Sequence, residues 1–263
     1  MSSIKGGYDL STAIYSPEGR IFQLEYISKF IKNSPLIIGI ICSDGILLLG
    51  ENSKEITIGK YFNTKKIFYI NSKSALAATG QPGDYTRLIE RIRFEDKTYL
   101  RNFSELLTGN PLSSKFSEII HLHTIYWHLR PFACSVILGT ISCYIPNLFS
   151  ILSTGFFSKC VASAIGRNSK FLKNTLSTSI NLKKSCRQNL TLISMHLIKI
   201  QKNFEEEAFE ILWFTKDFPT FKKPIAFNLE KEAYRKNKLF LKKVLDEEEK
   251  RKTIELSYFN RKK

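Results

Sequence analysis

The sequence lacks the features that would mark a secreted or membrane-spanning protein. Its longest apolar runs, Leu36–Cys42 and Ile46–Leu49, are too short to span a bilayer. Met1–Leu10 has no apolar stretch of the kind that a secretory signal peptide needs. We therefore expect a soluble, intracellular protein with no membrane partner.

Cysteine and histidine are scarce, and their spacing suggests no metal site. The five cysteines are odd in number and contain no C-x-x-C spacing. This pattern is typical of buried free thiols in a reducing compartment, not of a disulfide framework or a zinc site. The close pair His121 and His123 would point to different sides of a helix. The sequence predicts no metal and no cofactor.

Acidic residues are also few, with 24 Asp and Glu against 40 Lys and Arg and a formal charge of +16. Such a charge can indicate a nucleic-acid-binding protein, which would be retained on DNA or RNA in a salt-sensitive way. The basic residues are scattered, however, and no helix-turn-helix, zinc-finger or RNA-recognition signature is present. We expect no specific nucleic acid as a partner, and keep this function as an alternative.

Motifs of common catalytic sites are missing as well. The sequence contains neither a G-x-S-x-G nucleophile motif nor a phosphate-binding G-x-x-x-x-G-K-[ST] loop. The Gly6-Gly7 pair is more typical of a flexible tail than of a phosphate cradle.

The chain does contain alternating strand-like and helical segments. Leu36–Cys42 and Ile46–Gly50 form a predicted hairpin around Ser43-Asp44-Gly45, since Asp-Gly between apolar runs is a strong hairpin signal. A second strand pair is expected at Lys65–Ile70 and Ala75–Gly80. The later expected elements are helices at Gly83–Leu107 and Ser113–Leu129 separated by a break at Asn110-Pro111, strands at Phe132–Cys143, Leu148–Leu152 and near Phe156 and Ala162, helices from Gly166 to Leu176 and over Ser185–Asn203, strands at Ala208–Phe214 and Phe221–Phe227, and a charged helix from Asn228 to Lys252.

This order predicts an α+β fold in which two antiparallel sheets pack face to face with helices outside. No change of composition marks a linker. We expect a single domain over residues 1–250, followed by a basic tail over residues 251–263. The basic tail could be an exposed extension or a nuclear-import signal.

The most informative segment is Tyr8–Lys32. It reads as an extended start, a tight turn at Ser16-Pro17-Glu18-Gly19 and an amphipathic helix. The apolar stripe of that helix consists of Ile21, Leu24, Ile27 and Ile31. From the pattern alone, the stripe indicates an ordinary first helix that packs on the chain's own core.

The exact residues of this segment are more informative than its pattern of polar and apolar positions. The run Y-D-x-x-x-x-x-[FY]-S-P-E-G-R-[IL]-F-Q-[LV]-E-Y closely resembles the amino-terminal signature of proteasome α-type subunits. The resemblance implies a four-layer αββα sandwich of the amino-terminal-nucleophile hydrolase type, without the nucleophile. It also implies a non-catalytic ring subunit of the 20S core in ATP- and ubiquitin-dependent protein degradation, in the cytoplasm and nucleus.

The resemblance assigns roles to the amino-terminal residues. Residues 1–15 would belong to the gate over the axial pore, and residues 19–32 would form a helix that packs between neighbouring subunits through its apolar stripe. The residues that match the family's gate and turn positions are Tyr8, Asp9, Pro17, Gly19 and Tyr26. Implied partners are the other α subunits of a seven-membered ring, β-ring subunits, and the carboxyl termini of activators or of the regulatory particle.

The same resemblance bears on catalysis. Catalytic relatives use a free amino-terminal threonine, helped by an aspartate and a lysine. Here those positions resemble Pro35, Glu51 and Lys66. Proline has no hydroxyl and its mid-chain nitrogen is no base, so we expect no catalytic residue. An active amino-terminal-nucleophile hydrolase is the alternative.

Lys66 also matches the family lysine that receives the terminal carboxylate of an activator in a pocket between α subunits. Lys65 stands beside it, one position away in the register. The alternative for Lys66 is an ordinary solvent-exposed lysine.

Overall fold

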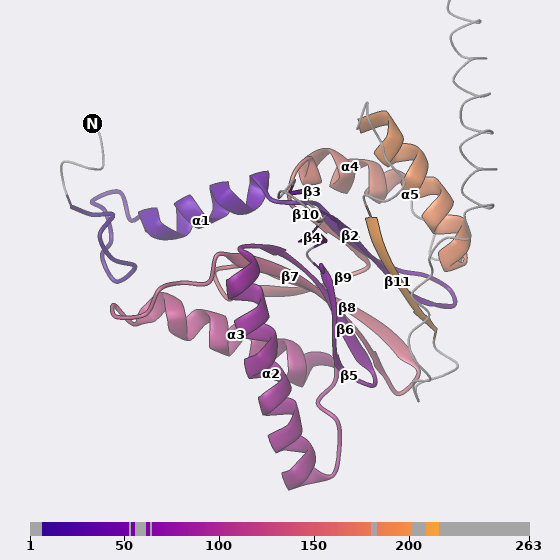
Figure 1. The fold of residues 1–263 in the computed structure, drawn as a ribbon, viewed down its shortest axis with the longest axis horizontal. Helices are drawn as coiled ribbons and strands as arrows, with labels where there is room; N and C mark the ends of the chain where they lie inside the picture. The colour runs from indigo at the N-terminus through magenta and orange to yellow at the C-terminus, as the bar shows by residue number, and fades with distance from the viewer. Residues whose placement is uncertain are drawn as a thin grey trace, which may run out of the picture. The chain divides into compact units, whose positions relative to one another are not determined.

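Two antiparallel β-sheets form the centre of the molecule (Figure 1). The computed structural model describes residues 7–52, 54–55, 62–63, 65–179, 183–200 and 209–215. Within these residues the first sheet has the strand order β10-β1-β2-β11 and the second has the order β5-β6-β7-β8-β9, and a short ribbon pairs β3 with β4. The strands are β1 (Ile37–Ile41), β2 (Gly45–Glu51), β3 (Lys54–Glu55), β4 (Phe62–Asn63), β5 (Ile67–Asn71), β6 (Ser74–Gly80), β7 (Cys134–Ser142), β8 (Ile145–Ile151), β9 (Phe157–Cys160), β10 (Ala162–Ile165) and β11 (Phe209–Thr215).

The described helices are α1 (Phe22–Asn33), α2 (Pro82–Phe103), α3 (Gly109–Ile125), α4 (Ser169–Ser179) and α5 (Cys186–Ile200). None of them is both long and apolar enough to cross a membrane. Together with the two antiparallel sheets they confirm the predicted mixed α+β class.

The predicted hairpin between the first two strands is confirmed. Ile41 pairs with Ile46 across a turn that contains Asp44, and the register continues to Ile37 opposite Gly50. Every residue of β2 is buried, because β2 lies between β1 and β11 in the sheet and has further layers on both of its faces.

Three groups of buried apolar side chains show how the layers pack. The first lies between the second sheet and α2 and α3, and includes Leu88, Phe116 and Val136. Another lies between the two sheets, where Ile37 of β1 and Ile137 of β7 belong to one cluster. The third lies between the first sheet and α4 and α5. Each sheet is therefore covered by the other on one face and by helices on the opposite face.

The expected boundary between the second and third helices is wrong. We expected Asn110-Pro111 to break the chain and a helix to begin at Ser113, but α3 begins at Gly109 and includes Pro111 in its first turn. Proline is tolerated there because the first amide groups of a helix have no partner within it. The break comes earlier, where Ser104 ends α2 with a positive φ of 57°.

Several expectations lie outside the described residues. They are the strand at Phe221–Phe227, the helix from Asn228 to Lys252, the tail over residues 251–263 and the first six residues of the gate segment.

Candidate functional site: the amino-terminal turn, helix α1 and Lys66

The predicted turn before α1 is present. The Gly19 amide donates to the Ser16 carbonyl oxygen at 2.8 Å, which closes the turn. Gly19 has a φ of +74° and no atom lies within 4 Å of the position a Cβ would take. Glycine is therefore favoured at this turn by its backbone conformation and not by lack of space.

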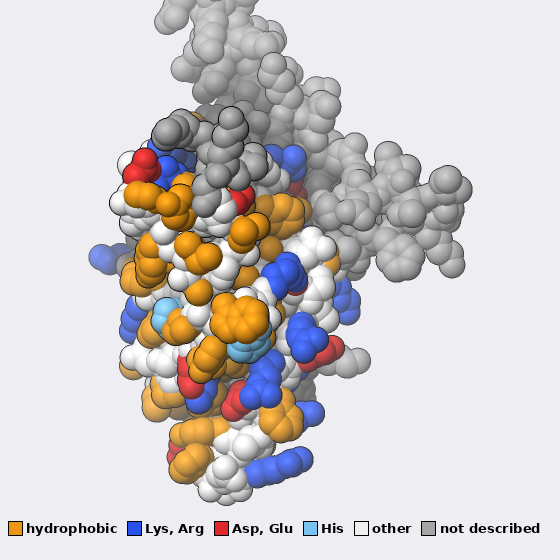
Figure 2. Space-filling view, turned by 90° about the vertical axis from the view of Figure 1, so that its left-hand side faces the viewer, with side chains coloured by type: hydrophobic (Ala, Val, Ile, Leu, Met, Phe, Trp, Pro, Cys, Tyr) orange, Lys and Arg blue, Asp and Glu red, His pale blue; other side chains and the backbone are white. Residues whose placement is uncertain are grey.

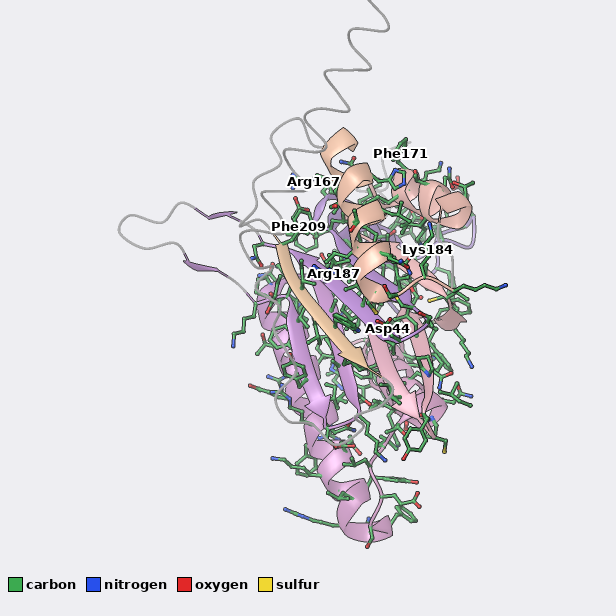
Figure 3. The ribbon with its side chains drawn as sticks, turned by 90° about the vertical axis from the view of Figure 1, so that its right-hand side faces the viewer. Asp44, Arg167, Phe171, Lys184, Arg187 and Phe209 are labelled. Atoms are coloured by element: carbon green, nitrogen blue, oxygen red, sulfur yellow. The ribbon has the colours of Figure 1, made fainter. Side chains whose placement is uncertain are left out.

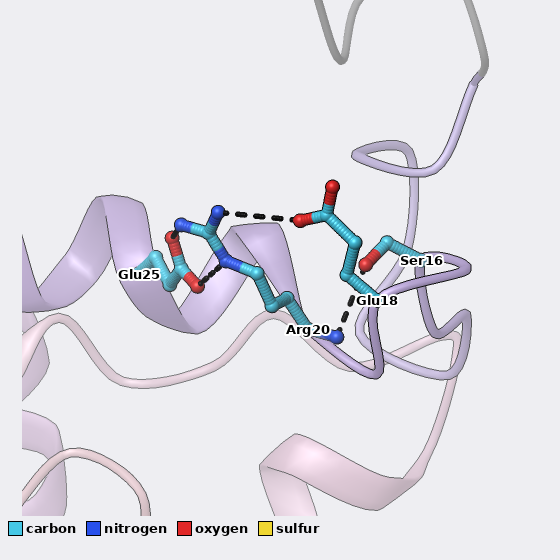
Figure 4. A network of polar contacts seen from close by, with 4 residues as sticks. All are labelled: Ser16, Glu18, Arg20 and Glu25. Carbon is cyan, nitrogen blue, oxygen red and sulfur yellow. Dashed lines mark hydrogen bonds and ion pairs between the residues drawn. The ribbon is translucent and has the colours of Figure 1, made fainter.

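Side chains reinforce the turn (Figure 4). The Ser16 hydroxyl oxygen accepts a hydrogen bond from the Arg20 amide at 3.0 Å. The Arg20 guanidinium then reaches forward to the first turn of α1, where its Nε donates to Glu25 Oε1 at 2.6 Å and its Nη2 pairs with the other carboxylate oxygen. Glu18 lies 3.7 Å from the same guanidinium. The Arg20 side chain thus fixes the angle at which the chain enters α1.

This ion pair changes the titration of both partners. The hydrogen bond from Arg20 lowers the pKa of Glu25, and the hydrogen bond to Glu25 raises the pKa of Arg20. Sequence reasoning placed Ser16 in the turn but foresaw none of these side-chain contacts, and it assigned no role to Arg20 or Glu25, although all three residues belong to the motif. A basic residue just before a helix with an acidic residue in its first turn was the available signal.

The predicted gate residues lie around the start of α1. The Asp9 carbonyl oxygen accepts a hydrogen bond from the Gln23 side chain, which holds the amino-terminal segment against the helix. Pro17 is exposed, and Tyr8 and Tyr26 are each more than one-third exposed. Tyr26 stacks on Phe22 with 6.5 Å between ring centroids.

The apolar stripe of α1 is covered unevenly. Ile31 is buried in the core cluster between the two sheets, and Ile27 packs against the same cluster. Ile21 does not lie in the helix as expected, because α1 begins at Phe22 and Ile21 precedes it in extended conformation. Ile21 and Leu24, at the amino end, are only half-buried. The carboxyl half of the stripe is therefore part of the chain's own core, and the amino half keeps accessible apolar surface.

Apolar side chains outside this helix are exposed as well. They include Leu10, which is 81% exposed, and Trp127 in the loop after α3, which is 77% exposed. Figure 1 places the amino-terminal segment and the loop after α3 on one side of the molecule, and Figure 2 shows hydrophobic side chains gathered on that side. Large apolar areas of this kind on a surface are typical of contacts with other proteins.

Pro35, at the position that matches the catalytic threonine, lies just before β1 within a continuous chain. Its carbonyl oxygen accepts a hydrogen bond from the Thr79 hydroxyl at 2.5 Å. The next residue, Leu36, donates its amide to Glu51 Oε2 at 2.8 Å, and Arg167 donates to Glu51 Oε1 at 2.9 Å. The Glu51 carboxylate is thus engaged by the backbone of the first strand and by a guanidinium.

Lys66 is not a solvent-exposed lysine, so that alternative is wrong. It is 1% exposed, whereas its neighbour Lys65 is exposed. Its Nζ lies 5.4 Å from the centroid of the Tyr85 ring, a distance at which an ammonium group is attracted to the ring face.

The backbone at Lys66 explains this burial. Its amide donates to Glu210 Oε2 at 2.8 Å, and the amide of Ile67 donates to the same oxygen at 3.1 Å. Gly50 packs against the Lys66 side chain, because a Cβ on Gly50 would lie 2.6 Å from Lys66 Cβ. Burial is also the main cause that raises the pKa of Tyr85 to about 12, with a smaller contribution from the charge of Glu210. Sequence reasoning missed Glu210, which lies 144 residues from Lys66.

Comparison with known proteins identifies the family. Residues 31–213 match the proteasome family of subunits, and residues 8–26 match the amino-terminal signature of A-type proteasome subunits. The chain is 31% identical over 211 residues to the alpha type-3 proteasome subunit of Oryza sativa subsp. japonica, covering 80% of this chain and 85% of the relative. It is 32% identical over 215 residues to the protein of the same name from Arabidopsis thaliana, with the same coverage.

The similarity extends along nearly the whole chain in a further relative. The alpha type-3 proteasome subunit of Acanthamoeba castellanii is 28% identical over 252 residues, covering 94% of this chain and 97% of the relative. The segments Tyr8-Asp9-Leu10-Ser11 and Arg130-Pro131-Phe132 resemble the seventh α subunit, also called α type-3, and α type-3 is the name that these relatives carry. The signature at residues 8–26, the family match over residues 31–213 and these relatives together show that the chain belongs to the proteasome α-type subunits.

Proposed function

We propose that this chain is a non-catalytic subunit of the α-ring of the 20S proteasome core, where it serves as ring scaffold, as part of the axial gate and as part of the activator docking surface. As a proteasome subunit it assembles with other proteasome subunits in the machinery of protein degradation. The finer assignment includes a seven-membered ring with other α subunits, contact with a β-ring, and a place in the cytoplasm and nucleus.

One observation carries the non-catalytic assignment. The position that matches the catalytic threonine is Pro35, and it is joined without interruption to α1 through Ser34, whose amide donates to the Ile31 carbonyl oxygen at 3.1 Å. A residue inside the chain has no free amine to act as base, and proline has no hydroxyl to attack. The order of layers, helices around two stacked sheets, supports the αββα sandwich of the amino-terminal-nucleophile hydrolases as the scaffold.

The test of this assignment combines native mass spectrometry and peptide hydrolysis. Material isolated from cells is expected in a stacked-ring complex, with the amino-terminal segment still present. The purified full chain is expected to leave fluorogenic peptides intact. A processed chain that begins near residue 35 and hydrolyses peptides, with loss of activity in Lys66→Ala, would establish the hydrolase alternative instead.

The gate assignment draws support from the anchoring of the amino-terminal segment. The Gln23 side chain binds the Asp9 carbonyl oxygen, and the Arg20–Glu25 pair joins the turn to α1. The amino-terminal segment is therefore attached to the helix at two places. The exposed Pro17 and the partly exposed rings of Tyr8 and Tyr26 are then available for contacts across a subunit boundary. Deleting residues 1–11 should increase peptide hydrolysis by particles that lack an activator, and an unchanged rate would contradict the gate role.

The activator assignment rests on Lys66. A buried ammonium group beside an aromatic ring is a strong partner for a carboxylate that reaches it, because little water competes. Since Lys66 is 1% exposed, a terminal carboxylate would have to displace neighbouring side chains in order to pair with it. Lys66→Ala should weaken activator-stimulated hydrolysis by the assembled particle, with Lys65→Ala as the matched control. Equal stimulation in wild type and Lys66→Ala would refute the assignment.

The scaffold assignment follows from the uneven cover of α1. Ile21 and Leu24 offer apolar surface at the amino end of α1, and a neighbouring subunit would bury it. Substitution of both Ile21 and Leu24 by serine should reduce incorporation of the chain into rings in co-expression experiments. Normal incorporation would contradict a role for this part of α1 in the ring.

A further inference from the structure

Two cysteines and an aspartate that are distant in sequence come together where the first sheet meets α5. Cys42 follows β1, Asp44 lies in the turn to β2, and Cys186 is the first residue of α5. One ligand atom from each of the three, the two Sγ atoms and a carboxylate oxygen, lie within 4.8 Å of one another. Figure 3 shows Asp44 at the start of α5, on the side that also carries Lys184 and Arg187.

Hydrogen bonds hold these groups in place. The Cys186 amide donates to Asp44 Oδ1 at 2.8 Å, which fixes the carboxylate against the first turn of the helix. The Asn189 side chain, one turn further on, donates from Nδ2 to Cys42 Sγ at 3.3 Å. The contact between the Cys186 amide and Asp44 is of the kind that metal sites need, because it orients a ligand before the ion arrives.

The two thiols are hydrogen-bonded to each other, and Cys186 also contacts the Asp44 carboxylate. The hydrogen bond from Cys186, and to a lesser extent that from Asn189, lower the pKa of Cys42. The same contact with Cys42, together with burial and the nearby Asp44 carboxylate, raises the pKa of Cys186.

Asn189 offers a further observation that points to a ligand. This residue is 1% exposed, and its Oδ1 is a buried atom for which no hydrogen-bond partner is present among the described residues. The amide lies against Cys42, and rotation of its terminal group exchanges Oδ1 with Nδ2. In this rotation Nδ2 gives up its two donor contacts, at 3.3 Å to Cys42 Sγ and 3.4 Å to the Lys184 carbonyl oxygen.

We propose that Cys42, Asp44 and Cys186 bind one thiophilic divalent cation of the zinc class, with the Asn189 amide oxygen in the fourth position. Zinc–sulfur bonds are about 2.3 Å long, so two thiolates on one tetrahedral ion lie about 3.8 Å apart, within the spread of this cluster. Each thiol that coordinates releases its proton to solvent, and two thiolates with one carboxylate neutralise the ion with one negative charge in excess. Two basic residues, Lys184 and Arg187, lie on the same side of the molecule as Asp44.

Burial favours a bound ion over reversible oxidation of the two thiols. Cys42 and Cys186 are only 2% and 1% exposed, which limits access for a peroxide or a disulfide reagent. The sequence predicted no metal site because the ligands come from segments 142 residues apart, at Asp44 and Cys186, and include no C-x-x-C pair. The bound ion would join the β1–β2 turn to α5 and stabilise the helical layer on the first sheet.

The test is cobalt and cadmium titration of the full-length chain, stripped with a chelator and kept reduced. Wild type is expected to take up one equivalent with a thiolate-to-metal charge-transfer band, and zinc should displace the cobalt. Asp44→Asn and Asn189→Ala, which keep both thiols, should weaken binding, the latter by about tenfold or more. The double variant Cys42→Ser/Cys186→Ser should lose the band, and Cys143→Ser, which removes an exposed thiol elsewhere, should keep it.

The variants that keep both thiols allow the test even if the double variant fails to fold. Metal content of the particle purified from cells gives an independent readout, with one zinc expected per copy of this chain. Absence of the charge-transfer band in wild type, or a band of unchanged affinity in both Asp44→Asn and Asn189→Ala, would overturn the proposal. A Cys42–Cys186 disulfide in the purified particle would also overturn it, and would show a redox pair in place of a metal site.

Discussion

Glu51 and Arg167 form an ion pair that bridges the start of the first strand. Arg167 Nη2 lies 2.9 Å from Glu51 Oε1, and the Leu36 amide donates to the other carboxylate oxygen of Glu51 at 2.8 Å. Glu51 ends β2 and Arg167 follows β10, the two strands that flank β1 in the sheet. One carboxylate therefore joins three neighbouring segments at the point where the chain leaves α1.

Glu51→Ala should destabilise the chain. It leaves the buried Leu36 amide without its acceptor, and an unsatisfied buried donor costs about 1–3 kcal/mol. Urea denaturation of the full chain measures the change. Glu118→Ala is the matched control, because its pair with Lys115 is exposed and should contribute at most about 1 kcal/mol. Equal stability of the two variants would show that the Glu51 contacts are unimportant.

Gly50→Ala should be destabilising for a different reason. The new Cβ would lie 2.6 Å from Lys66 Cβ inside the sheet packing, and overpacking of this kind costs about 1–3 kcal/mol. Gly83→Ala in the first turn of α2 is the control, since no atom lies within 4 Å of its Cβ position. It should be neutral or stabilising by up to about 1 kcal/mol. The midpoints of denaturant unfolding of the two variants measure this difference. A loss of stability in Gly83→Ala as large as that in Gly50→Ala would contradict the steric account.

The Arg20–Glu25 pair predicts a specific change of titration. Because Arg20 lowers the pKa of Glu25, the stabilising contribution of the pair is present at neutral pH and is lost as the pH falls through that lowered pKa. Carboxyl NMR titration of Arg20→Gln should show the pKa of Glu25 moving up toward its ordinary value. Lys115→Gln, which breaks an exposed pair elsewhere, should leave it unchanged. A pKa of Glu25 that does not move in Arg20→Gln would rule out the pair as the cause.

Two tyrosines, the buried Tyr85 and the half-buried Tyr69, should make the chain sensitive to alkali. Burial, with a smaller effect of the Glu210 charge, raises the pKa of both Tyr69 and Tyr85 to about 12. An unfolded tyrosine titrates near about pH 10. Between about pH 10 and 12 the unfolded chain therefore binds fewer protons than the folded one, and stability falls as the pH rises. Denaturation at several pH values should show a shallower fall in Tyr85→Phe than in wild type or in the exposed-site control Tyr144→Phe; identical slopes would be the contrary result.

The two ends of the α1 stripe should respond differently to truncation. Ile31→Ala removes a buried side chain from the cluster between the sheets and should cost about 2–4 kcal/mol in the isolated chain. Ile21→Ala removes a half-buried side chain and should cost about 1 kcal/mol or less. Denaturation of the two variants side by side tests this difference, and a larger loss at Ile21 would reverse our account of the helix.

Local signals predicted much of this fold. Asp44-Gly45 between two apolar runs indicated the first hairpin, and the observed register places the turn there. The start of α3 was wrong because proline was interpreted as a helix breaker, whereas Pro111 occupies the first turn, where no intrahelical hydrogen bond is lost. Patterns of polarity could not distinguish these two uses of proline.

Long-range contacts explain what the sequence could not predict about the site. The burial of Lys66 depends on Glu210 and Gly50, and no local pattern distinguishes Lys66 from the exposed Lys65. The division of the α1 stripe depends on how far the helix extends over the gap between the sheets, which brings only its carboxyl half into the core. Both features arise from tertiary packing, which the spacing of residues along the chain does not predict.

The position of β11 has a consequence for synthesis of the chain. β11 pairs with β2 along its whole length, from Phe209 opposite Glu51 to Thr215 opposite Gly45. On the ribosome, the amide and carbonyl groups along that side of β2 have no native neighbour until residue 215 has emerged. A nascent apolar strand with an open side can pair with the wrong chain, so this polypeptide is exposed to mispairing along β2 until β11 has emerged.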